Sequence, residues 1–235
     1  MSFWEDVFGS GPQFENGRHK RLPVPDNQYV NAIIVSSINK ERLVARGSTA
    51  VTYDVTEEMK EKIKSHLISV ESLFSDKCGK KLTIRPVWGP VTTGNPDKAV
   101  IDAETLESDY TEQMKSIFNH NKTYFPEIEL VILYAKGDAL KSGVSGRSWY
   151  RKFEEESYYH SFIIMSESAT EKVLAHELGH ILNFTNKDGA KNDPDPMENE
   201  PEHNKNPGNL MHKEVTTTDI TEEQCKQFFE SKIIQ

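Results

Sequence analysis

The sequence lacks several features that would assign the protein to a class at once. Its 235 residues contain no apolar run of the roughly 18–20 residues that a membrane-spanning helix requires. Basic residues are in deficit, 28 against 37 acidic ones, and the net charge of −9 argues against nucleic acids and anionic membranes as partners. No secretory signal is recognisable at the N-terminus. We therefore expect a cytoplasmic protein, one exported by another route, or a secreted protein whose signal has been removed.

Cysteine is also scarce, with Cys78 and Cys225 alone. Two cysteines do not identify the redox compartment. They could form one disulfide or remain two buried thiols, and of these we favour the buried thiols. No internal repeat is present.

The order of patterns along the chain predicts an α+β fold, with a mixed twisted sheet and helices between its strands. Residues 1–28 indicate an extended arm, either a disordered tail or a docking or pro-segment, before a single domain over residues 29–235. We expect an upper lobe over 29–183 and a lower lobe over 184–235. Strands are predicted over 29–37, 43–55, 82–88, 128–135 and 161–165, an edge strand over 142–150, and helices after Thr56, over 108–120 and from Thr221.

The strongest motif is His-Glu-Leu-Gly-His at residues 176–180. Ser168 and Glu171 have the spacing of a capping box, which predicts a helix beginning eight residues before His176. At about 100° per residue, His176 and His180 lie about 40° apart on one face of that helix. Leucine and isoleucine side chains gather on the opposite face: Leu174, Leu178, Ile181 and Leu182.

This division between two faces suits zinc chemistry. Two neutral imidazoles one turn apart can bind one Zn²⁺. Glu177 is placed to act as the general base towards a zinc-activated water, and afterwards to return the proton to a leaving amine. The motif therefore predicts a zinc-dependent enzyme that hydrolyses peptide bonds.

The third ligand is less evident. A catalytic zinc usually has three protein ligands and one open position. In the longer pattern His-Glu-x-x-His-x-x-Gly-x-x-His, Asn183 and Asn186 occupy the Gly and His positions. Asn183 can replace the glycine, because Asn tolerates the left-handed backbone of a helix exit. Asn186 is a poor zinc ligand.

His203 lies eight residues before Met211, within His-Asn-Lys-Asn-Pro-Gly-Asn-Leu-Met. Together with the motif at 176–180, this spacing resembles the metzincin metalloproteases, closest to the matrixin-like branch with its Met-turn. The resemblance implies a zinc metalloendopeptidase of zincin-like fold, with an active-site helix and a small irregular C-terminal lobe. It also implies that His176, His180 and His203 bind Zn²⁺ and that Met211 forms an apolar base beneath the ion. This sequence differs from the compact family pattern by an insertion, since 22 residues separate His180 from His203 where that pattern has five.

Other residues compete with His203 for the third position. They are Asn186 and Asp188, the loop glutamates Glu198, Glu200 and Glu202, and His212 directly after the Met-turn. The segment 186–209 has almost no apolar residues and is expected to be a surface loop. Asp193 and Asp195 within it could bind Ca²⁺, although a solvated loop is the simpler interpretation.

The segment 142–150 resembles the edge strand on which such proteases bind extended peptides by strand addition. This implies Gly143, Val144, Ser145 and Gly146 as substrate-binding residues. The expected partner is a protein or peptide substrate, without nucleic acid or membrane insertion, and the oligomeric state stays open. Two alternatives remain: a catalytically silent or latent binding module on the same scaffold, and a protease toxin of narrow specificity.

Overall fold

The fold is described from a computed structural model over residues 14–15, 18–19, 28–36, 40–44, 51–88, 101–106, 109–183 and 192–234. The predicted α+β class is confirmed, with a twisted mixed sheet and helices on both of its faces. Within these segments, every helix is too short or too polar to span a bilayer. Most of the arm predicted over 1–28 lies outside the described residues, as do Asn186 and Asp188.

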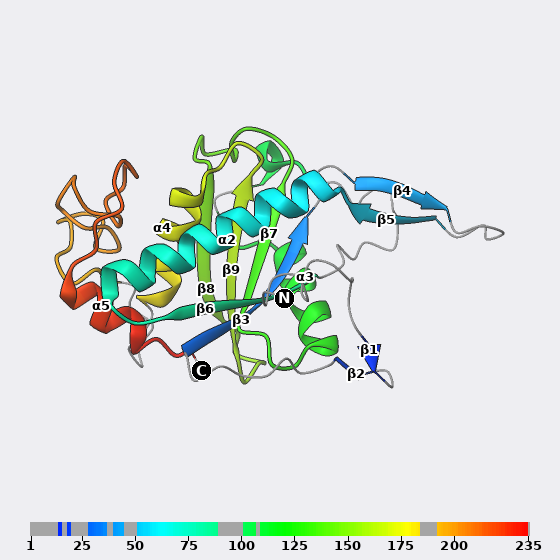
Figure 1. Cartoon of the computed structure of the whole chain (residues 1–235), viewed down its shortest axis with the longest axis horizontal. Helices are drawn as coiled ribbons and strands as arrows, with labels where there is room; N and C mark the ends of the chain where they lie inside the picture. The colour runs from blue at the N-terminus through cyan, green and yellow to red at the C-terminus, as the bar shows by residue number, and fades with distance from the viewer. Residues whose placement is uncertain are drawn as a thin grey trace.

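A five-stranded sheet in the order β6-β3-β7-β9-β8 forms the centre of the molecule (Figure 1). Four of its strands are parallel, and β8 runs antiparallel to β9 at one edge. The inner strands are almost wholly apolar because both of their faces are covered. The strands are β3 (Gln28–Ser36), β6 (Leu82–Trp88), β7 (Leu130–Ala135), β8 (Gly146–Lys152) and β9 (Tyr159–Ser166).

Two small hairpins stand apart from this sheet. β1 (Phe14–Glu15) pairs with β2 (Arg18–His19), and β4 (Lys40–Val44) pairs with β5 (Val51–Val55). The single strand predicted over 43–55 is therefore wrong. Its β-branched run contains Gly47 and Ser48, residue types that favour chain reversal.

The helices cover the sheet from both sides. α2 (Glu57–Cys78) and α4 (Glu171–Leu182) pack on one face, and α3 (Glu112–Tyr124) with the 3₁₀ turn η2 (Ala103–Thr105) packs on the other. α5 (Glu222–Phe229) lies against α2 and α4 (Figure 1). Alternation along the strands separates the two cores: Ile132 faces α2 and α4, whereas Val131 and Leu133 face α3.

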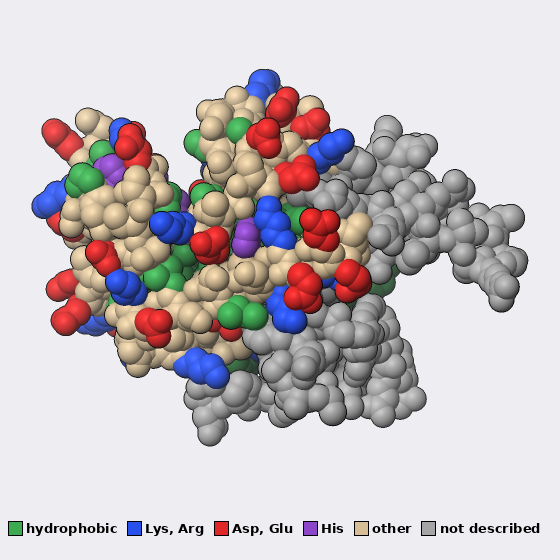
Figure 2. All heavy atoms as spheres, turned by 45° about the horizontal axis from the view of Figure 1, so that its top comes forward, with side chains coloured by type: hydrophobic (Ala, Val, Ile, Leu, Met, Phe, Trp, Pro, Cys, Tyr) green, Lys and Arg blue, Asp and Glu red, His purple; other side chains and the backbone are tan. Residues whose placement is uncertain are grey.

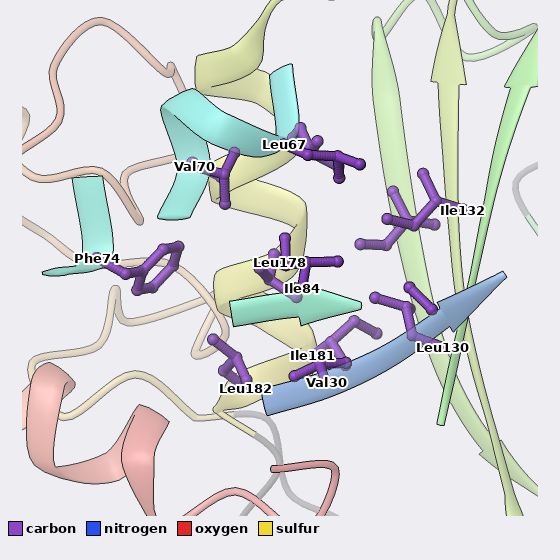
Figure 3. Close-up of a cluster of buried hydrophobic side chains, with 14 of the residues drawn as sticks. Val30, Leu67, Val70, Phe74, Ile84, Leu130, Ile132, Leu178, Ile181 and Leu182 are labelled. Carbon is purple, nitrogen blue, oxygen red and sulfur yellow. The ribbon is translucent and has the colours of Figure 1, made fainter. Parts of the chain in front are cut away.

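α2 begins and ends where the sequence predicts. The Thr56 hydroxyl accepts a hydrogen bond from Met59 N, and Gly79 adopts the left-handed conformation at φ 64°. Both are local signals, since a hydroxyl caps the helix start and a glycine permits its exit. Figure 3 shows the buried face: Leu67, Val70 and Phe74 of α2 and Leu178, Ile181 and Leu182 of α4 lie opposite Val30, Ile84, Leu130 and Ile132 of the sheet.

The outer edge of β6 is covered by a side chain from α2. Glu71 Oε1 accepts a hydrogen bond from Ile84 N at 2.6 Å. Burial raises the pKa of this carboxyl from 4.5 to about 7. Folding therefore favours the protonated form. The contribution of Glu71 to the free energy of unfolding is fully present below about pH 4.5, and it is lost as the pH rises through about 7.

Glu71→Gln keeps the acceptor and removes the charge. We expect it to raise the free energy of unfolding at pH 8 by about 1–3 kcal/mol and to change it little at about pH 4.5. Urea denaturation at both pH values, with chelator present, measures the difference. The exposed Glu58→Gln on the same helix is the matched control, and an equal gain at both pH values would contradict the prediction.

Candidate metal centre

Helix α4 carries the His-Glu-Leu-Gly-His motif into the interior. The helix begins at Glu171, with Thr170 at its N-cap, so the predicted capping box at Ser168 is wrong. The Ser168 hydroxyl instead donates to the carbonyl oxygen of Asp138 in a neighbouring loop. The faces still divide as expected. The leucine and isoleucine positions 174, 178, 181 and 182 are buried in the core, and the two histidines point to the other side.

Three histidines gather on that side. The candidate ligand nitrogens of His176, His180 and His203 all lie within 4.8 Å of one another, and Nε2 of His176 is 3.0 Å from Nε2 of His180. Two nitrogens that share one tetrahedral ion at about 2.0–2.1 Å lie roughly 3.3 Å apart. The spacing thus suits a single ion, and three imidazoles without a thiolate suit Zn²⁺. Among the described residues, no second group of three potential metal ligands lies this close together.

The protonation of these rings also suits a metal. His176 Nδ1 lies 2.8 Å from the Leu210 carbonyl oxygen, which can only accept. The hydrogen therefore resides on Nδ1, and Nε2 keeps its lone pair for a ligand. Burial lowers the pKa of His176 and is also the main cause that lowers the pKa of His203. Both rings favour the neutral form, which is the form that binds metal ions.

His203 reaches α4 because backbone bonds hold it on both sides. Its carbonyl accepts from Met197 N at 2.8 Å, and its N–H donates to Glu200 O at 2.9 Å. The next residue, Asn204, donates its backbone N–H to Met211 O at 2.9 Å. The inserted segment from residue 192 onward is therefore a folded support for the third histidine.

The competing ligands that the structure describes, Glu198, Glu200, Glu202 and His212, are not in the cluster. Glu200 lies beside His203, with Oε2 3.4 Å from Nδ1, and His212 Nδ1 accepts a hydrogen bond from Glu214 N at 3.2 Å. The calcium interpretation gains no support, because both Asp193 oxygens accept from N–H donors and Asp195 pairs with Lys205 at 2.6 Å. Asp193 itself is buried, so the solvated environment expected for this side chain is wrong, whereas most of the described residues 192–209 are exposed or partly exposed as expected for a surface loop.

Asn183 ends α4 in a different way from that predicted. Its backbone is right-handed, at φ −63° and ψ −10°, and not left-handed. The exit does not need a left-handed residue, because Asn183 N still bonds Gly179 O, and Gln227 Nε2 donates to Asn183 O. A side chain of α5 thus satisfies a carbonyl at the helix end.

Met211 packs directly against α4 and is fully buried. A Cβ built on Gly179 would lie only 2.3 Å from Met211 Sδ. Glycine inside a helix costs about 1 kcal/mol relative to alanine, and here it permits a close approach that no other residue allows.

Gly179→Ala should therefore lower the free energy of unfolding by about 1–3 kcal/mol, because the added methyl group displaces Met211. Urea denaturation of the metal-free protein measures the loss. The double variant Gly179→Ala with Met211→Ala should lose less than the sum of the single variants. Additive losses would show that the two side chains do not meet.

The edge strand begins beside the same helix. A Cβ at Gly146 would lie 2.5 Å from Val173 Cγ1 and 3.2 Å from Glu177 Cγ. Ser145 O accepts from Ser166 N at 2.8 Å. Because bonded and non-bonded residues alternate in an antiparallel pair, the backbone groups of Gly146 and Ser148 point away from β9, to the outer edge.

The remaining predicted substrate residues lie in the turn before β8. Gly143 has φ 83°, and Val144 is exposed. Figure 2 shows the surface hollowed between the lobe that contains residues 192–220 and the main body of the molecule.

Cys78 and Cys225 form a disulfide across a sequence separation of 147 residues, so the preference for buried thiols is wrong. The bond joins the last residue of α2 to α5. The sequence holds no signal for it beyond the even number of cysteines. The support of His203 by its own segment was also missed, because its hydrogen bonds to Met197 and Glu200 are made by backbone atoms and leave no pattern of side chains in the sequence.

The sequence matches no protein-family model and no curated protein. Among solved structures, the chain is similar to metalloproteinase-II from Bacteroides fragilis, with a TM-score of 0.46 and 13% identity over 96% of this chain. It spans 60% of that protein's length. A chaperone–substrate complex matches with a TM-score of 0.33 and 16% identity, over 68% of this chain and 24% of the other. Such distant likenesses leave the function to be argued from the site itself.

Proposed function

We propose that the protein is a zinc-dependent metalloendopeptidase in which His176, His180 and His203 hold one Zn²⁺. The observation that carries this proposal is the convergence of three buried or half-buried imidazoles on one point, two from one helical turn and one from a separate segment. A bound Zn²⁺ supplies a Lewis acid that acidifies water and polarises a carbonyl group. In this proposal Met211 forms the apolar support below the site, as in the metzincins that the sequence resembles.

Glu177 is the general base in this mechanism. Its side chain is 7% exposed and follows His176 directly, and its Cγ lies beside Gly146 at the start of β8. A carboxylate there can take a proton from the attacking water and pass it to the leaving amine. Burial strengthens its electrostatic effect, because little water screens the charge.

The substrate is an extended peptide in the cleft between residues 29–183 and 184–235. It adds to the outer edge of β8 as another strand, beginning near the turn Gly143 to Gly146. Backbone groups that face this edge close to Glu177 support the arrangement.

Ser148→Pro removes one N–H from that edge without removing a bond to β9. We expect KM for a peptide substrate to rise about 5–10-fold with kcat little changed, because one hydrogen bond contributes about 1 kcal/mol. Ser148→Ala, which keeps the N–H, is the control. If the two variants have the same KM, the substrate does not use this edge.

The function is tested by incubating the zinc-loaded protein with unfolded casein and with a diverse peptide mixture, followed by mass spectrometry. Cleavage should stop with chelator, return on adding Zn²⁺, and be lost in His203→Ala. Cleavage of a few peptides but not casein would indicate narrow specificity. A zinc-binding protein that cuts nothing would indicate a silent or latent binding module and overturn the proposal.

A further inference from the structure

Asp193 is a buried carboxylate that the proposed mechanism does not use. It is 3% exposed and lies in the inserted segment. Its Oδ1 accepts from Asn204 Nδ2 at 2.7 Å and from Asp195 N at 2.9 Å, and its Oδ2 accepts from Gln224 Nε2 at 2.6 Å. Removing a carboxylate from water is costly unless hydrogen bonds replace the lost hydration. Three donors do so here, from Asp195 in the same turn, from Asn204 after His203 and from Gln224 in α5.

These bonds continue through two buried amides. Gln224 Oε1 accepts from Asn209 Nδ2 and from Thr221 N, both at 2.8 Å. Asn209 Oδ1 in turn accepts from Met211 N at 2.8 Å and from Gln224 Nε2 at 2.9 Å. An amide can present either its oxygen or its nitrogen, but a carboxylate only accepts. Asp193 and the Thr221 N–H therefore together fix which way Gln224 points, and Gln224 and the Met211 N–H together fix Asn209.

The chain of bonds ends at the metal site on two sides. Asn204 directly follows His203, so the bond to Asp193 holds the backbone that carries the third histidine. Asn209 holds the turn that contains Leu210 and Met211. Because Leu210 O orients the His176 ring, this turn also fixes a histidine from α4.

We propose that Asp193 is a positioning residue of the metal centre, acting through the amides of Asn204, Gln224 and Asn209. The inference rests on the metal-binding function proposed above. It explains how the long segment of 22 residues between His180 and His203 is tolerated: this segment supplies the acceptor that orders the lobe around the third histidine.

Asp193→Asn tests this, because it keeps the shape and places a donor against another donor. We expect Zn²⁺ affinity, measured by chelator competition, to fall about 10–100-fold. The visible absorption of the Co²⁺-substituted protein should also change in position and intensity, as it reports the ligand geometry. Asp195→Asn is the matched control, since that carboxylate lies two residues away in an ion pair with Lys205 and should leave both readouts unchanged.

A second variant keeps the test valid if Asp193→Asn folds poorly. Asn204→Ala removes the donor next to His203 and leaves the Asp193–Gln224 bond, so it should show the same spectral change with a smaller loss of stability.

The outcomes separate the two proposals. Wild-type affinity and an unchanged Co²⁺ spectrum in both Asp193→Asn and Asn204→Ala would overturn the positioning role, even if stability falls. If His203→Ala binds Zn²⁺ as tightly as the wild type does, the proposed metal centre itself is overturned.

Discussion

Replacing Glu177 by Gln is expected to lower kcat/KM for peptide hydrolysis by about 10²–10⁴-fold, the range that a positioned general base contributes. Gln has nearly the same shape and still forms hydrogen bonds, but it cannot accept a proton at neutral pH. Zn²⁺ affinity should stay near that of the wild type, because the ion is assigned to three imidazoles and not to this carboxylate.

The measurement pairs initial rates on a cleaved peptide with chelator competition for Zn²⁺ on the same preparations. Glu171→Gln is the matched control, since it removes an exposed carboxylate from the first turn of the same helix. Its rate should equal that of the wild type. A Glu177→Gln protein that keeps full activity would remove the general base from the mechanism, whatever its metal content.

Elements with local determinants could be predicted from the sequence. α2 has a capping hydroxyl at Thr56, apolar residues at helical spacing and a left-handed glycine at its end. α5 has a reciprocal capping box between Thr221 and Gln224. Each signal acts within a few residues, and the hydroxyls of Thr56 and Thr221 do make their local capping hydrogen bonds. Ser168 shows the opposite case, because a carbonyl 30 residues away takes its hydroxyl.

The same distinction applies to the site. His176 and His180 are one helical turn apart, so their proximity follows from helix geometry alone. His203 could be selected by its spacing from Met211, but nothing local shows how it reaches α4. Asp193 looked like part of a solvated loop, because its segment is polar. Asp193 instead belongs to a buried hydrogen-bond network, and its partner Gln224 lies 31 residues away in the sequence.

Removing the disulfide with Cys78→Ser and Cys225→Ser is the variant with the largest expected loss of stability. A bond that closes a loop this long restricts the unfolded chain strongly, and its loss should lower the free energy of unfolding by about 2–5 kcal/mol. Besides the disulfide, side-chain packing and one ion pair connect the region of α5 to the end of α2. Phe74 and Phe228 pack edge to face at 5.4 Å, and Lys77 pairs with Asp219 in a largely exposed salt bridge.

The effect should extend to the metal centre, because Cys225 directly follows Gln224. A loosened α5 would move the amide that links Asp193 to Asn209. We therefore expect Zn²⁺ affinity to fall as well, and wild-type protein treated with reductant to behave like the double variant.

Denaturation with and without Zn²⁺ measures both effects, since a ligand that binds the folded state raises its stability. An unchanged unfolding midpoint would mean that side-chain packing alone holds α5. Since disulfides persist in oxidising compartments, the reduced protein also shows what would be lost in a reducing one.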